Sequence, residues 1–193
     1  MSRFCFLAIL LFVPIQAMAL TVEDTTYPDT VTMEGRTLHL VGAGMREKTI
    51  FKVDVYTMAV YVEKHTCNQI KLVHTDQAKL LRMDFVRDIP ADKMKATMTD
   101  NFTARTPKNA SGDLQGRINR FLALFNKKVL DKTQVRIIYV PGRGTSIYID
   151  GKKRGATITG PDFQNVLMDI WFNRDTCCPH LLEDIRATCT EKK

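Results

Sequence analysis

The chain has 193 residues, of which 45% are hydrophobic and 25% are charged, and its formal net charge is +7. This length suits one domain with a core of its own. The basic residues lie in short, scattered groups such as Lys127-Lys128 and Lys152-Lys153-Arg154, so we expect no nucleic-acid-binding surface. The positive charge leaves attraction to an anionic membrane surface or to anionic ligands open.

The beginning of the chain has the pattern of a secretory signal peptide. Arg3 supplies a positive start, residues 4–13 form an apolar core without charge, and Ala17-Met18-Ala19 forms a small-x-small cleavage site. We therefore predict a signal peptide at 1–19 and an exported domain at 20–193, which is periplasmic or secreted. The alternative is an uncleaved amphipathic anchor. No later segment has 18 uninterrupted apolar residues, so we expect no stable membrane span.

The first predicted strands of the domain form a hairpin. Residues 31–33 and 37–41 flank the turn Glu34-Gly35, and a second turn is expected at 42–44, where two glycines occur. The strand predicted at 53–62 is apolar at both odd and even positions. This pattern is typical of a central strand that is covered on both faces.

Arg46 lies just before this central strand. A guanidinium near a buried strand needs an anion or a set of acceptors, because an unpaired buried charge is costly. The functional interpretation is that Arg46 binds an anionic ligand. The alternative is an arginine at the rim of the sheet that is solvated or paired with Asp54 or Asp84.

The middle of the chain is expected to contain an irregular segment at 67–71, a strand at 79–87 and a helix at 91–105. One face of this helix carries Met94, Met98, Asn101 and Phe102. Asn101 is the only polar member of this face. It lies either at the edge, bonded to backbone or water, or it directs a polar group into a cavity.

The second half of the chain combines helices with short strands. A helix is predicted from Ser111, with apolar positions at helical spacing as far as Val129, and three antiparallel strands follow at 135–140, 146–149 and 153–158. A helix from Pro161 and a short helix after Pro179 complete the chain. This order predicts an α+β domain with helices layered on a mostly antiparallel sheet, and a ligand cleft between the two layers.

The predicted mature chain contains four cysteines: Cys67, Cys177, Cys178 and Cys189. An even number in an exported protein favours disulfide bonds. A helix at 179–188 would hold Cys189 about 14 Å from the 177/178 pair, whereas a disulfide tolerates about 7 Å between Cα atoms. We therefore expect Cys67 to reach that pair, unless the helix ends early. No CxxC motif and no second histidine accompany His180, so we expect no metal site and no cofactor.

Four stretches resemble the chalcone isomerase family, in particular its exported bacterial branch. They are LVGAGMREK…FKVDVYTMAVYVE, LLRMDFVRDIPADKM, YVPGRGTSIYIDGK and GPDFQNVLMDIWF. They cover most of the predicted mature chain in the order of the family. The resemblance implies an open-faced β-sandwich, in which a large antiparallel sheet is backed by a layer of helices and a ligand cleft lies between them.

In plant enzymes of this family, an arginine holds the anionic chalcone, hydroxyls from a threonine and a tyrosine polarise its carbonyl, and an asparagine flanks it. By resemblance, the arginine matches Arg46 and the asparagine matches Asn101. The threonine falls on Tyr56, with Thr57 beside it if the register slips by one residue. Arg46, Tyr56 and Asn101 are therefore the candidate catalytic residues if any catalysis remains.

Two positions depart from the family pattern. The tyrosine falls on Met94, which cannot donate a hydrogen bond, and losing such a donor typically costs about 10²–10³ in rate. A final serine or threonine falls on Asp169, which would repel a carboxylate. The resemblance thus favours a non-catalytic protein that binds a small amphipathic anion at Arg46, with Met98 among its contacts, as other superfamily members bind fatty acids. The alternatives are an isomerase (intramolecular lyase) with Tyr56 as donor, and a partner-binding protein without a small ligand.

Overall fold

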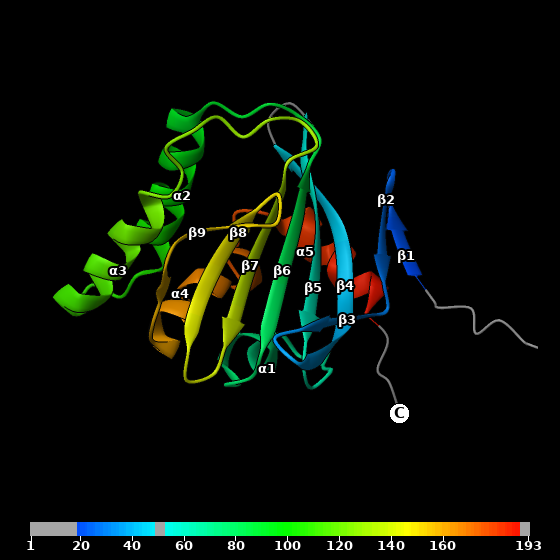
Figure 1. Cartoon of the computed structure of the whole chain (residues 1–193), viewed down its shortest axis with the longest axis horizontal. Helices are drawn as coiled ribbons and strands as arrows, with labels where there is room; N and C mark the ends of the chain where they lie inside the picture. Colours follow the sequence, from blue (N-terminus) through cyan, green and yellow to red (C-terminus); the bar gives the residue numbers. More distant parts are fainter. Residues whose placement is uncertain (1–18, 49–52, 190–193) are drawn as a thin grey trace, which may run out of the picture.

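The computed structural model describes residues 19–48 and 53–189 (Figure 1). The predicted signal peptide lies outside the described residues except for Ala19. The strands are β1 (Ala19–Val22), β2 (Thr25–Pro28), β3 (Thr30–Met33), β4 (Arg36–Lys48), β5 (Val53–Val62), β6 (Lys79–Phe85), β7 (Gln134–Val140), β8 (Gly144–Ile149) and β9 (Lys152–Ile158). The helices are α1 (Gln69–His74), α2 (Ala91–Arg105), α3 (Gly112–Leu122), α4 (Pro161–Phe172) and α5 (Pro179–Thr188).

Strands β3 to β9 form one antiparallel sheet in sequence order, and β1 pairs with β2 in a separate hairpin. Figure 1 shows α4 and α5 behind this sheet, and α2 and α3 to one side of it. The hairpin β1–β2 lies beside β4, at the other edge. The predicted α+β architecture, a large antiparallel sheet packed against helices, is confirmed. No helix in the described ranges is long and apolar enough to cross a membrane.

The central strand β5 separates two hydrophobic clusters. Tyr56, Met58 and Val60 belong to the cluster that contains the helices, whereas Ala59 and Tyr61 belong to the cluster on the opposite face. Successive side chains of a strand point to opposite faces, so both faces of β5 are buried as its apolar pattern predicts. One face of the sheet is therefore available to build a site together with the helices.

The turn predicted at 42–44 is wrong, because β4 continues through it as one strand of 13 residues. The glycines instead allow α5 to pack closely against β4. A Cβ atom on Gly42 would lie 2.3 Å from the carbonyl oxygen of Ile185, and one on Gly44 would lie 2.4 Å from Cβ of Asp184. Glycine in a strand often marks such an approach of another element.

Two further segments differ from the prediction. Residues 67–71 are not irregular throughout, because α1 begins at Gln69 after Asn68, whose side chain accepts a hydrogen bond from the Lys71 amide at 3.0 Å. Helix α3 ends at Leu122, so Val129 is not helical. It pairs with Ile89 through two backbone hydrogen bonds of 2.7 and 2.9 Å, and its side chain is buried in the core cluster that includes the helices.

The predicted bond between Cys67 and the 177/178 pair is also wrong. Cys67 is bonded to Cys189, with their Cα atoms 5.8 Å apart, and Cys177 is bonded to its neighbour Cys178. Helix α5 runs its full length to Thr188, so Cys189 is carried away from the start of the helix. The disulfide therefore joins the end of α5 to the segment before α1.

Candidate functional site

A cavity of about 520 Å³ lies between the sheet and α2. Its walls come from the end of β4, the beginning of β5, residues 87–90, the inner face of α2 and Trp171 of α4. A volume of this size is typical of a site for a small ligand. It occupies the place between sheet and helices where the sequence predicts a cleft.

Arg46 lies on the wall of this cavity and is partly exposed. It lies opposite Tyr56 in the register of β4 and β5, so both side chains project from the same face of the sheet. Within residues 19–48 and 53–189, no carboxylate forms a salt bridge with Arg46, and Asp84 is bound instead to Arg82 at 2.8 Å. The pairing of Arg46 with Asp54 or Asp84 is therefore not observed.

Tyr56 supplies a neutral hydroxyl to the cavity. Its oxygen accepts a hydrogen bond of 2.9 Å from Nε1 of Trp171, and its ring packs against Phe85 with centroids 5.2 Å apart. Burial raises the pKa of the Tyr56 hydroxyl, whereas the hydrogen bond from Trp171 and the charge of Arg46 act in the opposite direction. Because Trp171 only donates, the proton of Tyr56 is available for a ligand.

Helix α2 contributes the apolar wall and one amide. Met94 and Met98 are buried and face the cavity, and Asn101 lies one turn further along the same helix face. The helix begins and ends at the predicted residues, 91 and 105. A flexible thioether adapts to ligands of irregular shape, while the amide of Asn101 can donate or accept a hydrogen bond.

Two predicted site residues do not reach this cavity. Thr57 lies on the opposite face of the sheet, where it is fully buried and its hydroxyl accepts a hydrogen bond of 2.6 Å from Tyr27. Asp169 is two residues from Trp171 on α4, which places their side chains on opposite sides of the helix. Of the predicted site residues, the structure thus brings Arg46, Tyr56, Met94, Met98 and Asn101 together.

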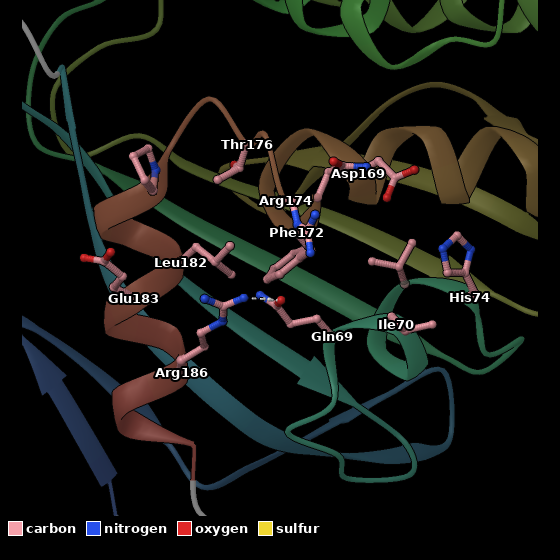
Figure 2. Close-up of a pocket in the computed structure, with 13 residues that line it drawn as sticks. Gln69, Ile70, His74, Asp169, Phe172, Arg174, Thr176, Leu182, Glu183 and Arg186 are labelled. Carbon is pink, nitrogen blue, oxygen red and sulfur yellow. Dashed lines mark hydrogen bonds between the residues drawn. The ribbon is translucent and has the colours of Figure 1, made fainter.

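Asp169 lines a second cavity of about 630 Å³ between α1, α4 and α5 (Figure 2). Figure 2 shows Phe172 and Leu182 projecting toward its centre, and Arg186 of α5 bonded to Gln69 of α1. Its lining carries guanidiniums and carboxylates in equal number: Arg174, Arg186, Asp169 and Glu183. This cavity therefore offers no excess charge to an anionic ligand.

Sequence reasoning missed several residues of the first cavity. Lys48, Arg87 and Lys93 line it, and Trp171 donates to Tyr56. The three cations carry no pattern that distinguishes them from solvated residues at the ends of strands and helices. Trp171 is visible in the sequence only as part of an apolar helix face, because its hydrogen bond depends on tertiary packing.

One group in the described chain has the residue types of a metal site. The ligand atoms of His65, Cys67 and Cys189 lie within 4.8 Å of one another. The two sulfurs are joined in a disulfide, so neither is a thiolate that could bind a metal ion. This group is therefore not a metal site in this structure.

Comparison with known proteins gives one family and one fold. A family model described as chalcone isomerase-like matches residues 19–181. Among solved structures, the chain is similar to a fatty-acid-binding protein of Arabidopsis thaliana, with a TM-score of 0.71 and 17% sequence identity, over 88% of this chain and 96% of that chain. No curated protein matches the sequence significantly. At this identity the structural likeness establishes the fold alone.

Proposed function

This chain belongs to the chalcone isomerase-like family, and on that premise we propose that it binds a small amphipathic anion, such as a fatty acid, in the cavity beside Arg46. One observation carries the proposal: a guanidinium without a carboxylate partner in the described chain lies on the wall of a largely apolar cavity of about 520 Å³. The similar Arabidopsis protein is a fatty-acid-binding protein, which supports the same class of ligand.

The proposed contacts follow from the arrangement of the side chains. Arg46 and Tyr56 lie opposite each other on neighbouring strands, so one carboxylate can accept hydrogen bonds from both. Asn101 can contact the same head group or the beginning of the tail. The apolar tail would lie against Met94 and Met98, where it leaves water.

Isomerisation of a chalcone is the second candidate function, and the free proton of Tyr56 is the observation that favours it. Met94 supplies no donor at the position where plant enzymes carry a tyrosine, so we expect ring closure of naringenin chalcone at its spontaneous rate. Closure above that rate, lost in Tyr56→Phe, would establish the enzyme instead.

Native mass spectrometry of the purified protein incubated with laurate tests the binding proposal. Loss of a charge-assisted hydrogen bond costs about 1.5–3 kcal/mol, so Arg46→Gln should weaken laurate binding about 10- to 100-fold. Arg120→Gln removes the same charge from an exposed position of α3 and should bind laurate like the parent. A parent protein that stays empty, or an Arg46→Gln variant that is equally loaded, would contradict the proposal.

We also propose that residues 1–19 direct export and are removed. The composition of this segment supports it, and the disulfide between Cys67 and Cys189 is of a kind that persists in oxidising compartments. N-terminal sequencing of the protein expressed from the full chain should find a start near Leu20. A product that retains Met1 would refute the cleavage.

A further inference from the structure

The cavity beside Arg46 carries more positive charge than one carboxylate requires. Its lining contains four cations, Arg46, Lys48, Arg87 and Lys93, and a single acid, Asp88. The three cations other than Arg46 are exposed, which places them at the mouth of the cavity. A fatty acid has one negative charge, so its binding would leave most of this positive charge uncompensated.

The single acid does not offset these cations. The carboxylate of Asp88 forms a salt bridge of 2.5 Å with Lys128 and accepts a hydrogen bond of 2.9 Å from the amide of Asp131. Both partners lie in the segment between α3 and β7, outside the lining of the cavity. In the part of the chain that the structure describes, the four lining cations themselves form no salt bridge.

The beginning of α2 adds to the positive potential. Pro90 precedes this helix of 15 residues, lies on the cavity wall and has no side chain that caps the helix. The acid of the first turn, Asp92, is exposed and does not line the cavity, so the first amide groups of the helix present their partial positive charge at the mouth of the cavity. Like charges repel when they converge on one cavity, and an anion of higher charge relieves that repulsion most.

We propose that the head group bound here is a dianion, a phosphate monoester on an alkyl or acyl chain, rather than a carboxylate. Arg46 and Tyr56 bind the inner phosphate oxygens, while Lys48, Arg87 and Lys93 compensate the second charge at the mouth. Three acceptor oxygens on a phosphate can be shared among several donors, whereas a carboxylate offers two. The inference rests on the proposed function, since the apolar tail occupies the same cavity.

Isothermal titration of the purified protein with ligands of twelve carbons each tests this inference. At pH 8 and low salt, dodecyl phosphate should bind at least tenfold more tightly than dodecyl sulfate, which has the same tail and one charge, and than laurate, which has twelve carbons in all and one charge. The second pKa of a phosphate monoester is about 6, so the advantage of dodecyl phosphate should disappear at pH 5. Inorganic phosphate should bind far more weakly, because it lacks the tail.

Variants that remove one positive charge test which residues bind the second charge of the phosphate. Arg87→Gln and Lys93→Gln should each weaken the binding of dodecyl phosphate by a larger factor than the binding of laurate, so the advantage of dodecyl phosphate should fall several-fold. Lys152→Gln, at the exposed beginning of β9, is the matched control and should leave both affinities unchanged. A reduction of equal size in the Lys152 variant would show general attraction to a basic protein and would overturn the assignment.

The outcomes separate this inference from the function on which it rests. Equal affinities for dodecyl phosphate and laurate would overturn the dianionic head group and leave the binding proposal intact. If neither dodecyl phosphate nor laurate binds, both the dianionic head group and the proposed binding function are overturned. Inorganic phosphate binding as tightly as dodecyl phosphate would identify a site for free phosphate and overturn the amphipathic ligand.

Discussion

Two arginine–tyrosine pairs lie on opposite faces of the sheet and differ in what surrounds them. On the face away from the helices, Tyr27 donates to Asp84 at 3.1 Å, and Arg82 is bound to the same carboxylate at 2.8 Å. On the helix face, Arg46 of β4 lies opposite Tyr56 of the neighbouring strand β5. These two residues have no carboxylate partner in the described ranges, and they border a cavity of about 520 Å³.

The same side-chain types therefore have different surroundings on the two faces. In the pair on the outer face, each charged group is satisfied by a neighbour, so the network stabilises the fold. In the pair on the helix face, the guanidinium and the hydroxyl proton face a cavity, where we propose that they bind a ligand. Substitutions on the outer face should change stability, and those on the helix face should change binding.

The largest expected effect is that of Asp84→Ala. Asp84 accepts hydrogen bonds from Tyr27 at 3.1 Å, Arg82 at 3.1 Å and Gln134 at 2.9 Å. Leaving these donors unpaired should lower the free energy of unfolding by about 3 kcal/mol. Urea denaturation measures this loss, and laurate affinity of the folded variant should stay unchanged. Asp54→Ala, at an exposed position of β5, is the control, and an equal loss there would show that the network does not stabilise the sheet.

The free energy of unfolding should depend on pH because Lys79 and Tyr61 are buried and ionise at shifted pH values in the folded protein. Burial lowers the pKa of Lys79 to about 8, whereas burial raises the pKa of Tyr61 to about 12. Between pH 8 and 10 the unfolded chain binds more protons at Lys79 than the folded protein, so stability should rise with pH, on the order of 2 kcal/mol. Above pH 10 the stability should fall, because tyrosines in the unfolded chain ionise at a lower pH than Tyr61 does in the folded protein.

Urea midpoints measured from pH 7 to 11 test this profile. Lys79→Met should abolish the rise between pH 8 and 10 and keep the fall above pH 10, since it leaves Tyr61 in place. A parent protein whose stability declines steadily from pH 7 would show that Lys79 does not govern this range.

Removing one hydroxyl from each face should give the smallest and most discriminating effect. Tyr27→Phe loses the bonds to Thr57 and Asp84, so it should cost about 1–2 kcal/mol of stability without changing laurate affinity. Tyr56→Phe should weaken laurate binding about tenfold, because a hydrogen bond to a charged carboxylate is worth at least about 1.5 kcal/mol. Calorimetric titration and urea denaturation of both variants measure the contrast. Identical behaviour of the two variants would remove the distinction between the faces.

Several parts of the fold are visible in the sequence because they depend on local periodicity. The apolar run of β5 predicts burial on both faces, and the spacing of Met94, Met98 and Asn101 predicts one face of α2. These patterns arise within single elements. The resemblance to a family adds Arg46, which periodicity alone leaves undecided between a solvated rim and a ligand site.

Other features depend on contacts between distant segments and could not be predicted. Gly42 and Gly44 suggest a turn until α5 is seen lying against them. Cys189 forms a disulfide with Cys67 because α5 places it beside the segment before α1. Lys93 resembles any exposed lysine of a helix, and only the fold brings it to the same cavity as Arg46.

A comparison of decanoate with decanol tests the central claim most directly. Both ligands have ten carbons, and only decanoate offers a charge to Arg46, so calorimetric titration of each into the parent and Arg46→Gln completes a thermodynamic cycle. The parent should bind decanoate at least tenfold more tightly than decanol, and this preference should vanish in Arg46→Gln. An undiminished preference in the variant would contradict the assignment of Arg46 as the residue that binds the anion.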